Sequence, residues 1–362
     1  MKVCVVTSWF PTDVKPGAGS FVATDARALA HDHDVRIVHF VDPHLDDGRR
    51  TINLDGIPGI RVPLQLTNPL SWIRAIRRAY PYLKNADVVH TMAFSSLLKI
   101  LPVPFSAPVV HTEHWHGMMR IRSSRFARLE KLAVKITMAR PTVASGVSSY
   151  LASEVEALSG RDVRVIPNIV DAPPLLDPPQ PEPSPQLRIL SVGYLSPIKD
   201  PLMAVRALGV LRERGVDAHL AWAGTGDMEA DVLELAEQLG VAQSLTLLGH
   251  VSRQELFRQL EMCNVVLHTS TEETFSLVAA EALVAGRPLV IQERGGHTDF
   301  AREPYTTFVH TRTPEAFADA IERAGEIGRT VDFTDVSRQL RHNFSEDAFR
   351  ERWSQVYREV TA

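Results

Sequence analysis

Short apolar runs alternate with longer amphipathic segments along most of the chain. The runs have the length of strands, and the segments between them have the length of helices. The runs are Val3–Thr7, Val35–Phe40, Val88–His90, Val109–Thr112, Val143–Val147 and Val163–Ile166 in the first half, and Leu187–Val192, His219–Ala223, Leu245–Leu248, Val265–His268 and Leu289–Ile291 in the second. This alternation predicts βαβ units, which form parallel sheets with right-handed crossovers.

A proline-rich segment from Asp171 to Gln186 separates the two halves. Closely spaced prolines disfavour helices and interior strands and favour an extended spacer. The sequence therefore predicts an α/β protein with two domains on a proline hinge and a cleft between the lobes. The predicted parts are a first domain over 1–172, a linker over 173–186, a second domain over 187–340 and a C-terminal helix over 341–362 that crosses back to the first domain.

The composition narrows the class of protein. The 362 residues are 44% apolar and 23% charged, and the net charge of −4 argues against general nucleic-acid binding. The two cysteines, Cys4 and Cys263, lie in apolar stretches and fit a reducing compartment. No apolar run approaches the roughly 20 residues that span a bilayer, and the apolar stretch at the start is too short for a signal peptide. We therefore expect a cytoplasmic protein.

The loop after the first strand of the second half contains a lysine, Lys199, directly before a predicted helix. It reads Gly-Tyr-Leu-Ser-Pro-Ile-Lys-Asp-Pro over 193–201, in which Asp200 is a typical N-cap and Pro201 a typical first helical residue. Lys199 thus lies beside a predicted helix N-terminus, where the helix dipole repels cations. A lysine there is favourable when an anion joins it. The alternative is a solvated surface lysine.

Two glutamates follow the fourth apolar run of the second half. A helix is predicted to begin near Ser276 and to stop at Gly286, which leaves Glu273 in the preceding loop and Glu281 on an apolar helix. A buried carboxylate on that helix requires a hydroxyl or cation partner. The backbone amides of 275–278 are suited to bind sugar hydroxyls or phosphate.

Two glycine loops open at the same predicted edge, at residues 224–227 and 295–297. Gly224-Thr225-Gly226 lacks the third glycine of a dinucleotide-binding fingerprint, because Glu229 occupies that position. A tight turn is the better interpretation.

These residues resemble glycosyltransferase family 4, which has the GT-B fold. Glu273 and Glu281 match the family's E-x7-E motif, and Lys199 matches its phosphate-binding lysine. Further matches are Gly249-His250-Val251, Ala285-Gly286-Arg287-Pro288, the glycine loop Gly17-Ala18-Gly19-Ser20-Phe21-Val22, Val147-Ser148, and Ile166-Pro167-Asn168-Ile169-Val170-Asp171. The resemblance covers nearly the whole chain and is stronger in the second half. It implies two Rossmann-like domains with parallel sheets that face each other across a cleft.

The sequence departs from the family pattern near the donor. Tyr194 stands where the family usually has an arginine, so one positive charge expected at the diphosphate is absent. Thr274 and Ser276 replace loop glycines. Their backbone amides remain, but the added side chains narrow the sugar pocket.

The resemblance implies a metal-independent, retaining transferase that moves a hexose-type sugar from a nucleotide diphosphate sugar, with UDP preferred to GDP. Lys199 and nearby amides would stabilise the leaving diphosphate, Glu273 would hold sugar hydroxyls, and Glu281 would hold the ribose. The implied donor-binding residues are Gly19, Lys199, Gly224, His250, Val251, Glu273, Thr274, Phe275, Ser276, Leu277, Val278 and Glu281. No aspartate-rich metal motif accompanies them, so we expect neither a metal nor another cofactor.

A histidine cluster marks the acceptor half, at 111–116. The family places a histidine at this strand end near the reacting sugar, and His114 is the match, which makes it the third implied catalytic residue beside Lys199 and Glu273. The cluster mixes strand and loop spacing, which disfavours a zinc site. Asp87, His90 and Asn168 are further candidates for the acceptor side.

Two alternatives of the same fold remain open: a nucleotide-sugar 2-epimerase and a catalytically impaired nucleotide-sugar binder. The E-x7-E placement and the Lys199 loop favour transfer over the epimerase, and Tyr194 is the only feature that favours the impaired binder. The sequence does not name the acceptor, which is a hydroxyl of a saccharide, a lipid-linked saccharide or a small natural product.

A basic segment lies between residues 120 and 140 of the acceptor half. At about 100° per residue, Arg128, Lys131 and Lys135 share one helical face. The segment also contains Arg122 and Arg125, and Arg74, Arg77 and Arg78 lie beside Trp72 in a nearby segment. The apolar residues Phe126, Leu129, Ala133 and Ile136 are predicted to face the core. We expect weak peripheral contact with an anionic membrane, against the alternative of a solvated helix packed on its sheet.

Overall fold

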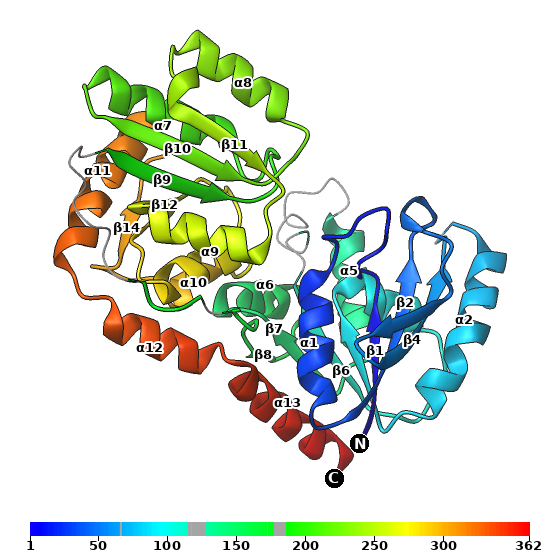
Figure 1. Cartoon of the computed structure of the whole chain (residues 1–362). Helices are drawn as coiled ribbons and strands as arrows, with labels where there is room; N and C mark the ends of the chain where they lie inside the picture. The colour runs from blue at the N-terminus through cyan, green and yellow to red at the C-terminus, as the bar shows by residue number, and fades with distance from the viewer. Residues whose placement is uncertain (66, 115–116, 118–126, 172, 177–185) are drawn as a thin grey trace. The chain divides into compact units, whose positions relative to one another are not determined.

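The computed structural model describes residues 1–362 except residues 66, 115–116, 118–126, 172 and 177–185 (Figure 1). The chain forms two compact units. Unit 1 comprises Met1–Ile169 and Phe344–Ala362, and unit 2 comprises Val170–Asn343. Each unit is an α/β domain built on one sheet, as predicted.

The sheet of unit 1 has the strand order β3-β4-β2-β1-β5-β6-β7-β8. Its neighbours pair in parallel except β3 and β4, which form an antiparallel hairpin at one edge. Prolines and a glycine interrupt the apolar pattern of β4, so the sequence did not reveal this hairpin. The strands are β1 (Lys2–Thr7), β2 (Asp34–Val41), β3 (Thr51–Leu54), β4 (Ile57–Pro63), β5 (Val88–Met92), β6 (Val109–Glu113), β7 (Val143–Gly146) and β8 (Val163–Val165).

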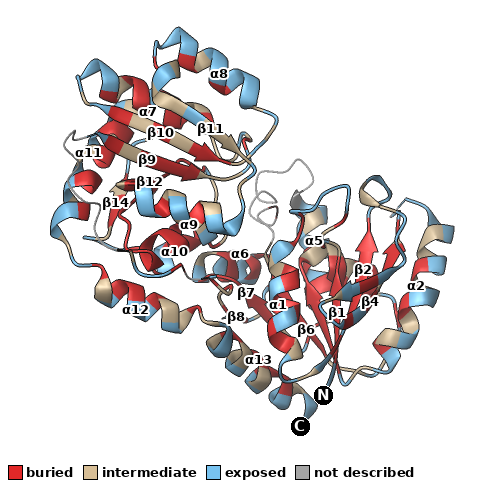
Figure 2. Cartoon of the chain, in the orientation of Figure 1, coloured by how far each residue is buried: buried red, intermediate tan, exposed pale blue. Residues whose placement is uncertain are grey.

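Helices cover both faces of this sheet, which explains why its central strands β5 and β6 are buried along their whole length. Figure 2 shows these strands largely in the colour of buried residues. Right-handed crossovers place α1 on one face and α2, α3 and α5 on the other, because the connections run in opposite directions across the sheet. The helices are α1 (Ser20–Ala30), η1 (Pro43–Leu45), α2 (Pro69–Lys84), α3 (Phe94–Ile100), α5 (Ala127–Met138), α6 (Ser149–Ser159) and α13 (Glu346–Thr361).

The sheet of unit 2 is parallel and has the strand order β11-β10-β9-β12-β13-β14. Its last strand, β14, was not among the predicted runs. The strands are β9 (Leu187–Val192), β10 (Ala218–Ala223), β11 (Leu245–Gly249), β12 (Val265–His268), β13 (Leu289–Gln292) and β14 (Thr306–Val309). The helices are α7 (Pro201–Glu213), α8 (Glu229–Gln238), η3 (Ala242–Ser244), α9 (Arg253–Met262), α10 (Leu277–Val284), η4 (Gly296–Asp299), α11 (Pro314–Thr330) and α12 (Thr334–Asn343).

Part of the predicted linker belongs to unit 2. The amide of Leu176 donates to the carbonyl of Ala285 at 3.1 Å, and the side chain of Arg341 binds the carbonyl of Pro173. Residues 177–185 of the predicted linker lie outside the described residues.

The core-facing side of α5 differs from the prediction. Val134, Thr137 and Met138 are buried, whereas Leu129 and Ile136 are exposed. The helix carries two apolar stripes, and the buried one also includes a threonine. Apolar periodicity alone therefore selected the wrong stripe. Arg122, Arg125 and Phe126 lie outside the described residues.

Across the described residues, the structure contains no helix that is both long enough and apolar enough to cross a bilayer.

Candidate functional site

The Lys199 loop connects β9 to α7 at the carboxyl edge of the second sheet. Asp200 caps α7 by accepting a hydrogen bond from the amide of Met203 at 3.2 Å, and Pro201 is the first helical residue, which confirms both predictions. Asp200 adopts a left-handed conformation with φ of 42°, which fixes the direction in which the chain enters the helix. The neighbouring loop at Gly224 packs so tightly that a Cβ there would lie 2.0 Å from the carbonyl oxygen of Gly193. The close backbone packing therefore requires a glycine at position 224.

Glu273 is the centre of a partly buried polar cluster. Its Oε1 accepts hydrogen bonds from Nζ of Lys199 at 2.6 Å and from Nε2 of His268 at 2.8 Å. The hydroxyl of Ser276 lies 3.1 Å from the same imidazole nitrogen. Burial alone would raise the pKa of Glu273, but Lys199 and His268 outweigh burial and hold the pKa well below its usual range. Glu273 is therefore ionised at neutral pH.

Arg312 fastens the Lys199 loop to the rest of the strand edge. Its Nη2 donates to Oδ2 of Asp200 at 2.5 Å and to the carbonyl oxygen of Thr269 at 2.7 Å, while Nη1 binds Oε1 of Gln292 at 2.5 Å. The hydroxyl of Thr269 in turn donates to the carbonyl of Lys199 at 2.8 Å. One guanidinium thus joins the Lys199 loop to the carboxyl ends of β12 and β13 and to its own loop after β14.

Helix α10 begins after Ser276 and carries Glu281 on its buried side, as predicted. The cation partner that burial requires is Arg253, whose Nη1 donates to Oε1 of Glu281 at 2.6 Å. The Nε of Arg253 also donates to Asp171 at 3.0 Å. Burial raises the pKa of Glu281 above its usual value even though Arg253 opposes that rise. Arg253 therefore keeps a carboxylate in an apolar helix that would otherwise favour the protonated acid.

The remaining predicted donor residues of unit 2 surround this cluster at the same edge. Gly224 follows β10, and the pair His250 and Val251 follows β11, with His250 exposed and Val251 half-buried. The residues that lead into and open α10 are Thr274, Phe275, Ser276, Leu277 and Val278.

Tyr194 and His297 are two further polar side chains at this edge. The hydroxyl of Tyr194 donates to Oδ1 of Asp227 at 3.0 Å, so this tyrosine is held by an acid and supplies no positive charge. His297 is buried, its Nε2 lies 2.6 Å from the carbonyl of Gln292, and its Nδ1 has no partner within the described part of the chain. Burial lowers the pKa of His297 to about 4, which leaves a neutral ring with one unused polar atom.

A second group of predicted residues meets at the carboxyl edge of the first sheet. Gly19 precedes α1 with φ of 64°, and a Cβ there would lie 2.2 Å from the carbonyl oxygen of Trp9. The ring of Phe21, in the first turn of α1, lies 4.4 Å from the ring of His114. Burial, and then His111, lower the pKa of His114 to about 3, so the ring is neutral. The nearby side chain of Asn168 opposes this lowering of the pKa of His114.

Two buried polar atoms in this second group have no partner among the described residues: Nε2 of His114 and Oδ1 of Asn168. A buried polar group without a partner is costly, and such atoms mark places where a ligand supplies the missing hydrogen bond. The structure thus brings together Gly19, His114 and Asn168 in unit 1.

Two predicted acceptor residues are not at this edge. Asp87 precedes β5, at the opposite, amino edge of the sheet, where its carboxylate accepts from the amide of Lys2 at 2.7 Å. His90 is fully buried, with its ring nitrogens 2.7 Å from the hydroxyls of Tyr357 and Thr112. The acceptor-side interpretation of both residues is wrong, because β5 continues two residues beyond His90 to Met92.

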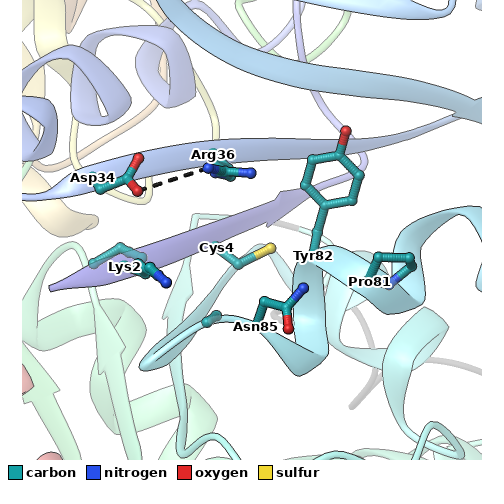
Figure 3. A pocket seen from close by; sticks show the side chains of 9 residues that line it. Lys2, Cys4, Asp34, Arg36, Pro81, Tyr82 and Asn85 are labelled. Atoms are coloured by element: carbon teal, nitrogen blue, oxygen red, sulfur yellow. Dashed lines mark ion pairs between the residues drawn. The ribbon is translucent and has the colours of Figure 1, made fainter.

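A cavity of about 410 Å³ also lies at the amino edge of the first sheet (Figure 3). It is lined by the starts of β1 and β2 and by the end of α2, including Cys4, Arg36 and Tyr82. Ligands of open parallel sheets bind beyond the carboxyl ends of the strands, so this cavity is not the candidate site.

Sequence reasoning missed three residues of the unit 2 cluster: His268, Arg253 and Arg312. His268 ends an apolar run and precedes an acidic loop in the sequence. A histidine at such a strand end is unusual, and this position could have marked it as a site residue. Neither arginine lies near the motif in sequence. Among the described residues, no group of three or more histidine, cysteine, aspartate or glutamate side chains is arranged to hold a metal ion.

Comparison with known families matches both units. The family described as Glycosyl transferases group 1 matches residues 175–350, and Glycosyltransferase Family 4 matches residues 16–172. The two matches together cover most of the chain, including both edge clusters.

Curated relatives are similar to part of the chain. An uncharacterized glycosyltransferase of Methanocaldococcus jannaschii is 34% identical over 136 residues, which is 37% of this chain and 35% of that protein. The D-inositol 3-phosphate glycosyltransferase of Mycolicibacterium gilvum is 33% identical over 140 residues, which is 38% of this chain and 32% of that protein. The similarity thus spans about a third of the length of each relative.

Solved structures share the whole fold. HepE of Anabaena, crystallised with UDP and glucose, superposes with a TM-score of 0.77 at 16% identity and covers 99% of this chain and 100% of its own. Sucrose-phosphate synthase of Thermosynechococcus elongatus gives a TM-score of 0.80 at 19% identity over 99% and 98% of the two chains. At these identities the likeness establishes the fold, which is that of two α/β domains with parallel sheets.

Proposed function

Since the chain belongs to the GT-B glycosyltransferases of the family 4 type, we propose that it transfers a hexose-type sugar from a nucleotide diphosphate sugar to a hydroxyl acceptor, with retention of anomeric configuration. The acceptor hydroxyl belongs to a saccharide, a lipid-linked saccharide or a small natural product. UDP is the preferred donor nucleotide over GDP, and the UDP bound to the structurally similar HepE supports that choice.

The Lys199–Glu273 pair at the N-terminal side of α10 carries this proposal. In the proposed reaction, the donor diphosphate takes over Lys199 as its counter-ion, and Glu273 turns to the hydroxyls of the sugar. The bond from the anomeric carbon to the diphosphate breaks as the bond to the acceptor oxygen forms on the same face. The acceptor proton passes to the departing diphosphate oxygen. Lys199 stabilises the charge that develops on that oxygen.

Titration calorimetry with UDP, GDP and their hexose conjugates tests the donor. We expect the wild-type protein to bind UDP and UDP-hexoses. In a turnover assay, Lys199→Ala should be slower by an amount that corresponds to about 2–4 kcal/mol of lost transition-state stabilisation, as for the loss of one oxyanion donor. Lys84→Ala, an exposed lysine at the end of α2, is the matched control. Turnover in folded Lys199→Ala that equals the wild type contradicts the proposal.

Chelation tests the expected independence from metals. In this proposal Lys199 and backbone amides carry the charge compensation, so turnover in excess EDTA should equal turnover in its absence. Loss of activity that magnesium or manganese restores would show that a divalent ion shares this role.

A further inference from the structure

Helix α5 presents an apolar stripe to solvent in unit 1. Leu129 is 67% exposed, and Leu132 and Ile136 are each 54% exposed. Single exposed leucines are common on protein surfaces and need no explanation. Three large apolar side chains on one stripe of one helix expose a continuous apolar strip, which soluble surfaces generally avoid.

A basic stripe runs directly beside the apolar one. At about 100° per residue, Leu129, Leu132 and Ile136 cluster on one side of the helix. Arg128, Lys131 and Lys135 fall on the adjacent side, and all three are exposed. The core-facing side is a separate set: Val134, Thr137 and Met138. Packing against the sheet thus accounts for neither exposed stripe.

Helix α2 shows the same combination on the same face of the sheet. Leu70 is 63% exposed and Ile73 is 57% exposed, and the outer side of α2 is coloured largely as exposed in Figure 2. These residues line a cavity of about 810 Å³ together with Arg74, Arg77 and Arg78. Both helices therefore pair exposed apolar side chains with cations, on a protein whose net charge is −4.

We propose that the solvent side of α5 docks on the surface of an anionic lipid bilayer. Leu129, Leu132 and Ile136 enter the boundary between headgroups and acyl chains, and the three cations of α5 bind the anionic headgroups. The exposed side of α2 adds further contacts of the same kind. This inference rests on the surface of unit 1 and not on the transferase activity.

Charge complementarity distinguishes a lipid surface from a second copy of the chain. A two-fold symmetric dimer through α5 would bring the same patch of both copies together. Arg128, Lys131 and Lys135 of one copy would then approach the same cations of its partner, with only the half-buried Glu130 of each helix to offset them. An anionic bilayer offers the apolar layer and the opposite charge at once.

Vesicle flotation with site-specific variants tests the docking. The probes are phosphatidylcholine vesicles with and without phosphatidylglycerol, at low and high salt. We expect binding to the anionic vesicles alone, and each of Arg128→Gln, Lys131→Gln and Lys135→Gln should weaken it by about fivefold at low salt. The triple variant Leu129→Ser, Leu132→Ser, Ile136→Ser should lose binding even though all cations remain. Leu233→Ser, at a 49% exposed leucine of α8 in unit 2, is the matched control.

A cysteine-linked dye reports insertion directly. Both native cysteines are buried, so Leu132→Cys and Leu233→Cys are labelled selectively with an environment-sensitive fluorophore. The dye at position 132 should shift to the blue with anionic vesicles, and the dye at 233 should not shift.

Three outcomes overturn the proposal. The first is equal, negligible recovery from anionic and neutral vesicles. The second is binding that depends on the cations but not on the three apolar residues, with no shift at position 132. The third is a dimer that forms without lipid and dissociates in the triple Ser variant. Calorimetry measures UDP binding by the same variants. Variants that bind UDP but not vesicles show that the membrane proposal and the transferase assignment are independent.

Discussion

At the scale of single residues, each of the two glutamates of the unit 2 cluster has a cationic partner. Lys199 holds Glu273, and Arg253 holds Glu281. The loss of a partner from a fully buried ion pair costs several kcal/mol, and the partial exposure of Lys199 and Arg253 lowers that cost here. In the proposed reaction, the donor diphosphate takes Lys199 as its counter-ion, and the backbone amides at the start of α10 share the remaining negative charge.

Substitution of the two glutamates separates their roles. Glu273→Ala should lower kcat with every donor sugar and leave the affinity for free UDP nearly unchanged, because Glu273 contacts the transferred sugar. Glu281→Ala should weaken the binding of free UDP by roughly 10- to 100-fold, as expected for the loss of hydrogen bonds to a charged group. Glu281→Gln, which keeps the shape, is the control for charge. Free UDP that binds Glu281→Ala as tightly as wild type contradicts the ribose assignment.

Asp25, buried in α1, makes stability depend on pH. Burial raises its pKa from 3.8 to about 8. Between these values the folded state keeps a proton that the unfolded state has lost, so this residue lowers the free energy of unfolding as pH rises. Asp25→Asn should therefore gain stability over the wild type by up to about 1.4 kcal/mol per pH unit across that window. Urea unfolding at pH 5 and pH 7.5 measures the gain, and parallel pH profiles would contradict it.

At the scale of elements, apolar runs predicted most strands because helices bury them on both faces. The runs failed where the environment differs: β4 is interrupted by Pro58, Gly59 and Pro63. Periodicity also failed on α5, since it identifies apolar stripes but does not show which one meets the sheet. Amphipathic patterns report burial only when a helix has a single apolar side.

The candidate site divides in the same way. Local patterns predicted Lys199, Glu273 and Glu281, because each lies on a loop or helix end whose cap residues are visible in the sequence. Arg253 and Arg312 were not predicted, because they reach these loops from distant segments. Their roles depend on the spatial order of the strands in the sheet, which brings these distant segments together.

The N-terminus of α10 stores backbone strain that a pair of substitutions can measure. Ser276 has φ of 71°, a conformation that costs a residue with a Cβ about 1–2 kcal/mol and glycine almost nothing. Ser276→Ala and Ser276→Gly both remove the hydroxyl that contacts His268 and caps Ala279. Ser276→Gly should therefore be more stable than Ser276→Ala by about 1 kcal/mol.

Chemical denaturation of both Ser276 variants gives this difference. The wild type serves as the reference for the lost hydroxyl. Equal stability of the two variants would mean that the loop relaxes when the hydroxyl is removed, and that the left-handed conformation is not imposed by the fold.

At the scale of the whole molecule, the chain returns to the unit in which it began. Helix α13 follows unit 2 in sequence but packs in the core of unit 1, against α1 and the strands. Trp353 and Tyr357 are fully buried there, and both termini lie in unit 1 (Figure 1). The apolar stripe of this helix and its return to the first domain were both predicted from the sequence, whereas the individual residues that it contacts there were not, because no local pattern indicates them.

Removal of a large side chain from α13 should therefore destabilise unit 1 and spare unit 2. Trp353→Ala should cost about 3–5 kcal/mol, as for other buried aromatic residues. Hydrogen exchange measured by mass spectrometry should show protection lost in 1–169 and 344–362 and kept in 170–343. The matched control, Phe317→Ala in the core of unit 2, should give the reverse pattern. If either substitution instead lowers protection equally in both units, the two units unfold as one cooperative body.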